Sequence, residues 1–438
     1  MGTEQQIAYF LSQLTNADKQ ADPERRAAAA KGLGRIGRPE HAEALTEAAA
    51  DPVPEVRASA ALGLGRLGVP EADATVLPGL MRDLDPWVRR RASVAAIRLK
   101  LTGRAVTEAF VGLLDDPDHH LRINALDGLY ALGVTGDVAA AARLLGDPEG
   151  AVWGRARKLL YRFREDPAVR AEVLRTAREG EGAARAQALQ MLPGHCGRRL
   201  LDSLLTGLRD PSPEVRHAAA RRLLDLKGRS VRDAWVEALR TERDPEVAGT
   251  LLSGLGWQGE RRVTDLAVRW LGDPRAGRWA AGALGDLGTG TAVEHLRRAL
   301  TDTELPATTR RAAALAVGRA GRWDAVWLLL PLLDDPGAEV RAGAVDGLGA
   351  RVHDGLRVWE RRPVADALTA HLASGRDATW RTCHALDGLT EALPALRRLA
   401  DEAPSAEVRA AALRLLTGGD TAAPQYVRCF ERGSGGRR

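Results

Sequence analysis

The chain has 438 residues, only 4 % of them aromatic, and a formal net charge of +5. A large β-sheet core would need more β-branched and aromatic residues, so the composition favours helices. The three cysteines (Cys196, Cys383 and Cys429) are too few and too scattered for a disulfide framework, and no apolar run reaches the roughly 18 residues of a membrane span. We therefore expect a cytoplasmic protein with no membrane contact.

The two ends of the chain differ from the long middle. Residues 1–20 predict a capping helix in which Ile7, Phe10 and Leu14 form the apolar side, while glutamines form the outer side that the end of a repeat array requires. Residues 421–438 end in Gly-Ser-Gly-Gly-Arg-Arg and predict a flexible tail.

Residues 21–420 repeat one motif: Asp-Pro, three residues, an aliphatic residue and Arg, followed by an apolar helix. The segment DPVPEVRASAALGLGRLG from Asp51 shows it clearly, and copies start at Asp116, Asp210 and Asp335. Most registers lie 30 to 33 residues apart, and the motif arginine marks them at Arg26, Arg57, Arg89, Arg122, Arg185, Arg216, Arg310, Arg341, Arg381 and Arg409, with degenerate copies at Trp153, Ala248 and Arg278. So regular a period predicts a repeat architecture.

Residues 51–81 show the physical basis of one unit. Pro52 and an acidic neighbour suit the first turn of a helix, and the apolar residues that follow recur at helical spacing up to Gly68, a favoured C-cap. Pro70 then opens a second helix. Two short helices bury their apolar faces only against the next pair, so neighbouring units stabilise each other.

This motif resembles HEAT repeats, in the variant called phycobilisome-lyase-like, as in bacterial HEAT repeat domain-containing proteins. The resemblance implies an all-α, right-handed α-α superhelix of about 12–13 helical hairpins over residues 21–420. The long spacing between Arg341 and Arg381 indicates an irregular insertion near residues 351–363, which would form an enlarged loop or an extra turn. In that family the motif Asp and Arg usually link adjacent repeats in a ladder. The resemblance therefore implies a structural role for Asp51, Arg57, Asp116, Arg122, Asp210, Arg216, Asp335 and Arg341.

The same resemblance places the second helix of each hairpin on the concave face. Residues 151–300 hold 27 basic and 19 acidic side chains, whereas residues 1–150 hold 17 and 21. If the middle arginines converge on a groove, they form a basic cradle for phosphate or carboxylate groups; otherwise they belong to a solvated face interspersed with acids. The candidate residues of this cradle are Arg198, Arg199, Arg229, Arg232, Arg261, Arg262, Arg269, Arg297 and Arg298.

Ten tryptophans against four tyrosines and four phenylalanines is an unusual ratio. Trp323 and Trp327 lie one helical turn apart and share a face, Trp359 is near in sequence, and Trp87 stands at a register that is normally exposed. These four are candidate aromatic anchors for a partner. The alternative is that most tryptophans fill the core or the space between repeats.

We expect no catalytic residue, no metal and no cofactor. The adjacent His119 and His120, near Asp118, could hold a metal, but exposure of polar residues in a loop is the commoner explanation. A bilin-lyase-like activity is an alternative that rests on repeat type alone. A DNA-glycosylase-like activity is another alternative, because the middle repeats hold Arg, Trp and Asp, but no motif of that family matches residue by residue. The favoured function is a scaffold or adaptor that binds a protein or peptide on its concave face, and the alternative is a nucleic-acid binder that uses the basic groove. The sequence does not predict the oligomeric state.

Overall fold

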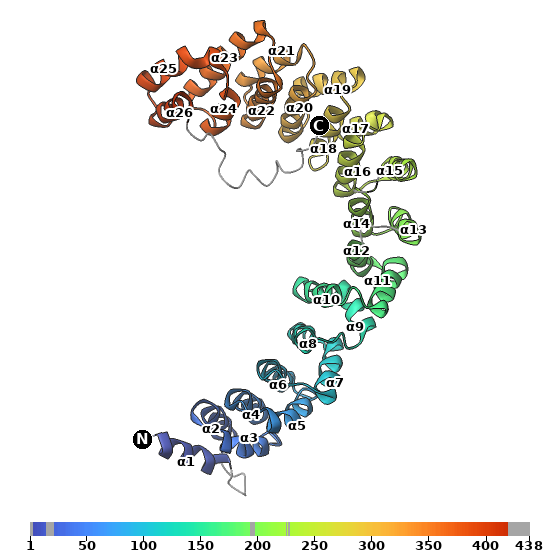
Figure 1. Ribbon diagram of the computed structural model, residues 1–438, viewed down its shortest axis with the longest axis vertical. Coiled ribbons are helices and arrows are strands. Elements are labelled where there is room, and N and C mark those ends of the chain that lie inside the picture. Colours follow the sequence, from blue (N-terminus) through green and yellow to red (C-terminus); the bar gives the residue numbers. More distant parts are fainter. Residues whose placement is uncertain (1–2, 15–21, 193–197, 225, 227, 419–438) are drawn as a thin grey trace. The chain divides into compact units, whose positions relative to one another are not determined.

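The computed structural model describes residues 3–14, 22–192, 198–224, 226 and 228–418, without the side chains of residues 70–74 and 198–200. The described residues form helices and turns and contain no strand, which confirms the all-α prediction. The chain divides into two compact units, Met1–Arg222 (unit 1) and Leu223–Arg438 (unit 2). Figure 1 shows that each unit is a stack of helical hairpins.

Unit 1 begins with α1 (Thr3–Leu14), whose Phe10 ring lies against the first hairpin at Gly32. We call the motif-bearing helix of each hairpin its first helix. The first helices are α2 (Pro23–Ile36), α4 (Pro54–Leu67), α6 (Pro86–Arg98), α8 (His119–Leu132), α10 (Gly150–Arg162), α12 (Gly182–Met191) and α14 (Pro213–Leu223). The second helices are α3 (Ala42–Ala48, preceded by η1, Pro39–His41), α5 (Pro70–Leu80), α7 (Arg104–Gly112, followed by η2, Leu113–Asp115), α9 (Val138–Arg143, followed by η3, Leu144–Gly146), α11 (Pro167–Glu179) and α13 (Arg198–Gly207).

Unit 2 continues the same alternation from α15 (Arg229–Thr241), a second helix. Its first helices are α16 (Pro245–Trp257), α18 (Gly277–Leu287), α20 (Ala307–Arg319), α22 (Ala338–Asp354), α24 (Thr379–Leu386) and α26 (Ala406–Thr417). The further second helices are α17 (Thr264–Trp270, preceded by η4, Arg261–Val263), α19 (Gly290–Thr301), α21 (Ala325–Leu329, followed by η5, Leu330–Asp334), α23 (Val358–Ser374) and α25 (Leu393–Glu402, preceded by η6, Thr390–Ala392).

The sequence signals of one unit are visible in α4. Pro54 stands in its first turn, whereas Pro52, expected there, lies in the turn that precedes the helix. Val56, Ala60 and Leu64 are completely buried. Gly68 closes the helix in the left-handed conformation, with φ +74°, which glycine adopts at little steric cost. The apolar face therefore begins and ends where the motif predicts.

Small residues let successive first helices lie in close contact. A Cβ on Gly65 would stand 2.6 Å from Ala95 Cβ, and one on Gly318 would stand 2.5 Å from Gly347 Cα. No side chain fits at such distances, so these backbones touch directly. In unit 1 the first helices form the row on the inner side of the bend and the second helices form the outer row (Figure 1). This differs from the expectation that second helices line the concave face, and close first-helix contact gives the physical reason.

The irregular region of unit 2 adds helix rather than loop. Both α22 and α23 have 17 residues, and only residues 355–357 connect them. The extra residues of the 351–363 region thus lengthen the hairpin, the second of the two alternatives. The expected tail, residues 421–438, and part of the expected N-terminal cap, residues 15–20, lie outside the described residues.

Candidate interaction surfaces

The motif Asp and Arg side chains form ion pairs between consecutive hairpins. Arg57 donates from Nε and Nη2 to the Asp83 carboxylate at 2.7 and 2.8 Å, and from Nη1 to the carbonyls of Asp51 and Pro52 at 2.8 and 3.0 Å. The hydrogen bond to Asp83 raises the pKa of Arg57, and the same bond lowers the pKa of Asp83. One guanidinium thus ties the turn that opens its own hairpin to the turn that opens the next.

The other predicted ladder residues lie in equivalent contacts. Asp51 accepts from Arg26, Asp116 from Arg89, Asp210 from Arg185 and Asp335 from Arg310, while Arg122 pairs with Asp147 and Arg341 with Asp377. Arg216 donates to the carbonyls of Asp210 and Pro211 at 2.9 Å each. The polar atoms of these side chains are engaged within the stack, which leaves them little capacity to bind a partner.

Arg381 does not continue this ladder, although the sequence register marks it as a motif arginine. It pairs with Asp346, which lies in the preceding first helix, α22. Helix α24 begins at Thr379, so Thr382 stands three residues into the helix, where Arg57 stands in α4, and it is buried. The spacing after the lengthened hairpin is therefore one residue out of register.

Most arginines of the expected basic cradle have acidic partners. Arg262 donates to Glu260 at 2.8 Å and to Asp233 at 2.7 Å, and Arg232 also lies near Glu260. The hydrogen bond from Arg262 lowers the pKa of Glu260 to about 2. Arg229 lies 3.8 Å from Asp233, Arg298 pairs with Glu294, and Arg297 pairs with Glu294 and Asp324.

Arg261 and Arg269 remain exposed and have no ion pair within the described part of the chain. The side chains of Arg198 and Arg199 lie outside the described residues. Carboxylates therefore neutralise much of the positive charge that the sequence places in the middle repeats.

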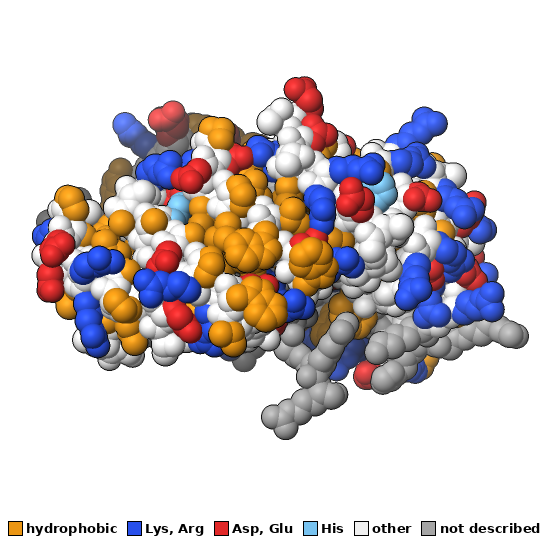
Figure 2. Space-filling view, turned by 90° about the horizontal axis from the view of Figure 1, so that it is seen from above, with side chains coloured by type: hydrophobic (Ala, Val, Ile, Leu, Met, Phe, Trp, Pro, Cys, Tyr) orange, Lys and Arg blue, Asp and Glu red, His pale blue; other side chains and the backbone are white. Residues whose placement is uncertain are grey.

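Unit 2 exposes a group of large apolar side chains that we call the tryptophan patch, made of Trp323, Trp327, Val358 and Trp359. Their exposed fractions are 61, 46, 84 and 63 %. Trp323 and Trp327 flank the start of α21, Val358 and Trp359 begin α23, and α23 packs against η5, the continuation of α21. Figure 2, a view onto this face of unit 2, shows hydrophobic side chains gathered near its centre, over α21 and α23.

The tryptophan patch is large enough to matter energetically. Its three indoles together expose on the order of 400 Å², taking roughly 250 Å² for a whole side chain. The largest apolar patch of a typical monomer exposes about 300–600 Å², and such a patch often has a function. The alternative, a tryptophan in the core, holds for Trp235, which is completely buried.

Trp87 lies in the first turn of α6 and is 48 % exposed. The guanidinium carbons of Arg90 and Arg91 stand 5.7 and 4.5 Å from its ring centroid, which is cation–π distance. The sequence analysis named Trp87 as a candidate but not Arg90 and Arg91. The run Trp87-Val88-Arg89-Arg90-Arg91 could have indicated that arginines surround this tryptophan.

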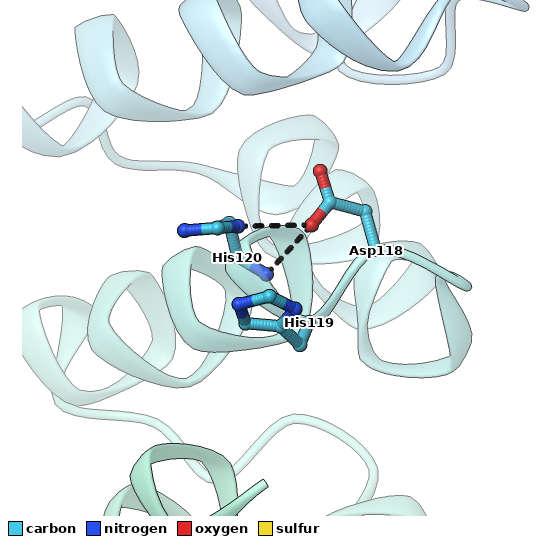
Figure 3. Close-up of side chains that lie close together, drawn as sticks. All are labelled: Asp118, His119 and His120. Atoms are coloured by element: carbon cyan, nitrogen blue, oxygen red, sulfur yellow. Dashed lines mark hydrogen bonds and ion pairs between the residues drawn. The ribbon is translucent and has the colours of Figure 1, made fainter.

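Asp118, His119 and His120 form the one cluster of the described residues with three closely spaced metal-ligating groups, whose ligand atoms lie within 4.8 Å of one another (Figure 3). The Asp118 carboxylate accepts from the backbone N–H of His120 at 2.9 Å and lies 3.2 Å from its Nδ1. Although burial acts to raise the pKa of Asp118, these hydrogen bonds lower it overall. Capping α8 accounts for this arrangement without an ion.

No helix in the described part of the chain combines the length and the apolar character that crossing a membrane requires.

Comparison with known proteins identifies HEAT repeats in parts of this chain. Models of HEAT repeats match residues 10–98 and 232–308, and a model of a single HEAT repeat matches residues 200–226. No curated protein matches the chain.

Solved structures that share this fold include Kap121p bound to Pho4p (13 % identity, TM-score 0.57), the karyopherin Kap121p bound to the extreme C-terminus of the protein phosphatase Cdc14p (13 %, 0.58), and Kap95p, described with RanGDP (10 %, 0.60). Each match covers 94 % of this chain and, in the same order, 53, 53 and 68 % of the other. The chain thus spans about half the length of Kap121p, and at such identities the likeness is one of fold.

Proposed function

The chain belongs to the HEAT-repeat family, and on that premise we propose that it is a scaffold that binds a partner protein or peptide through the tryptophan patch of unit 2. The observation that carries the proposal is the exposure of Trp323, Trp327 and Trp359 at the starts of two successive second helices, α21 and α23. Tryptophan is enriched among the residues that dominate protein interfaces. The structures with a similar fold include complexes with other proteins, which supports the same class of function.

The energetics favour a covered patch. Removing about 400 Å² of apolar surface from water contributes on the order of 10 kcal/mol before the costs of association are subtracted. Arg357 stands 5.3 Å from the Trp359 ring and supplies charge at the rim. An apolar centre with a polar rim is the usual composition of a protein interface.

We do not extend the proposal to nucleic acid. A phosphate backbone needs several cations free to replace its counterions. In the middle repeats Arg232, Arg262, Arg297 and Arg298 already face carboxylates. In unit 1 the first helices form the inner row, so a concave binding face would consist of first helices there (Figure 1).

Site-specific photocrosslinking tests the proposal. A photoreactive phenylalanine analogue replaces Trp327 or Trp359 in the chain expressed in its native host, and the control replaces Trp257, which is 59 % exposed in the same unit. We expect the same discrete adduct with another protein from both patch positions, its loss when Trp323→Asp is added, and no such adduct from position 257. Helicity measured by circular dichroism checks that every variant is folded.

Three results would overturn the proposal: no adduct, an adduct equally strong from position 257, or an adduct only with a second copy of this chain.

A further inference from the structure

A hollow of about 280 Å³ opens between the first helices α4 and α6 of unit 1. Leu62 and Val94 give it apolar walls, and Trp87 stands at its edge. Arg90, Arg91 and Arg98 also line it. Because small-molecule sites usually start at about 300 Å³, this hollow has the size to hold one large side chain and its neighbours rather than a cofactor.

Among the described residues, none of the three arginines of this hollow forms an ion pair. Arg155 and Arg311, on other first helices, do have such partners: Arg155 pairs with Asp127 at 2.9 Å and Arg311 with Glu339 at 2.6 Å. Three guanidinium groups around an apolar floor attract an anion that also has something apolar to bury.

The nearby acids are occupied by other contacts. Asp83 is bound to Arg57, and Asp85 accepts the backbone N–H groups of Trp87 and Val88 as the N-cap of α6. Asp118, at the start of the next first helix, feels the charge of Arg90 but is hydrogen-bonded to His120. These described acids therefore leave the three arginines of the hollow without an ion-pair partner.

We propose that this hollow binds a short acidic peptide segment that carries one large apolar or aromatic side chain. The apolar side chain lies on Leu62 and Val94 beside the Trp87 ring, and the flanking carboxylates accept from the arginines. Guanidinium and carboxylate groups match in geometry and pair in a bidentate way. Stacking against Trp87 holds Arg90 and Arg91 near the hollow and reduces the conformational entropy lost on binding.

Charge complementarity favours a peptide over a nucleic acid. A nucleic acid needs a positive track several repeats long, whereas residues 1–150 carry more acidic than basic side chains. The next first helix presents Asp118 and Asp127, not further unpaired arginines. The hollow is a local positive site, suited to a few carboxylates.

The inference goes beyond the proposed function, because it assigns a ligand class to a different surface. Fluorescence anisotropy tests it on the full chain with a labelled peptide, Glu-Asp-Glu-Asp-Phe-Asp-Glu-Asp-Glu, at low salt. Comparison probes replace Phe by Ser, replace every acid by its amide, or use a single-stranded oligonucleotide of equal charge. The variants are Arg91→Gln, Arg90→Gln and Trp87→Ala, and the control is Arg104→Gln, an exposed arginine of α7 paired with Glu108.

We expect the acidic phenylalanine peptide to bind, with a loss of affinity of about 10-fold or more for Arg91→Gln and Arg90→Gln and no loss for Arg104→Gln. The Ser and amide peptides should bind at least tenfold more weakly. Trp359→Ala should leave peptide binding unchanged, which separates this site from the tryptophan patch. If Trp87→Ala lowers helicity, the Arg90→Gln and Arg91→Gln variants still test the inference. Neither substitution removes an ion pair of the described residues.

The inference is overturned if the acidic peptide does not bind, if the amide peptide binds equally well, or if the oligonucleotide binds more tightly with a steep log-linear dependence on salt.

Discussion

Replacing Asp83 by alanine should loosen one junction of the stack and leave distant hairpins unchanged. Asp83 is 10 % exposed and its partner Arg57 is 17 % exposed. The variant leaves Nε and Nη2 of Arg57 without an acceptor and also removes the acceptor of the Asp85 backbone N–H. Nη1 keeps its two carbonyl acceptors, so the guanidinium stays in place.

The magnitude follows from this geometry. Breaking a fully buried ion pair costs about 3–5 kcal/mol, and losing hydrogen bonds to a charged group costs about 1.5–3 kcal/mol. Because water can reach part of Arg57, we expect a local cost of about 2 kcal/mol. At about 1.4 kcal/mol per tenfold change, hydrogen exchange in α4 and α6 should become roughly 30-fold faster.

Hydrogen exchange followed by mass spectrometry is the suitable assay, because repeats unfold locally and a single melting temperature is not well defined for them. The matched control is Glu108→Ala, which removes an exposed ion pair with Arg104 and should change nothing measurable. Unchanged exchange in α4 and α6, or faster exchange spread evenly over unit 1, would refute the reasoning.

The same pair sets a pH dependence. The hydrogen bond from Arg57 holds the pKa of Asp83 below its ordinary value of 3.8 in the folded chain. Its contribution to stability is therefore fully present above about pH 4 and is lost as the pH falls through the lowered pKa. The difference in exchange between wild type and Asp83→Ala should shrink below pH 4, and a constant difference down to pH 2 would contradict the assignment.

Three further predictions concern other contacts. Gly318→Ala should destabilise the α20–α22 junction by about 1–3 kcal/mol, since its Cβ would meet the backbone of the facing helix, whereas Gly282→Ala, with open space around it, should stabilise α18 by about 0.5–1 kcal/mol. Hydrogen exchange in α20, α22 and α18 compares the two variants, and equal effects would contradict the steric argument. Arg262→Gln should raise the pKa of Glu260 from about 2 towards 4.5, as measured by carboxyl NMR, and a value that stays near 2 would exclude Arg262 as the cause. Asp118→Ala should cost about 1 kcal/mol through loss of the α8 cap, seen as faster exchange in its first turn, and an unchanged first turn would mean that the cap contributes little.

The fold was predictable because one local pattern is repeated. Asp51, Pro52 and Arg57 recur with their spacing intact, so the turn, the helix start and the junction between hairpins could be anticipated together. The register failed after the lengthened α22–α23 hairpin, where Arg381 pairs with Asp346. An insertion shifts the position of the motif residues in the following helix, and only the packing of α24 shows the size of this shift.

The surfaces were predictable only in part, because charge partners lie one repeat apart. Arg262 meets Asp233, 29 residues earlier, and Arg311 meets Glu339, 28 residues later. Counting arginines along the sequence identifies the cations but does not show which carboxylates of the neighbouring repeat lie beside them. Arg90 and Arg91 were passed over for the converse reason, since only the three-dimensional structure shows that they line a hollow beside Trp87 and form no ion pair with the described residues.

Oxidative footprinting of the tryptophans tests the central claim, that the patch on unit 2 is where a partner binds. The chain is isolated with its native partner, and the reactivity of each tryptophan is compared with that of the free chain by mass spectrometry. We predict that Trp323, Trp327 and Trp359 become protected while Trp257, equally accessible in the free chain, stays reactive. A stable complex in which the patch tryptophans react as fast as in the free chain would contradict the account.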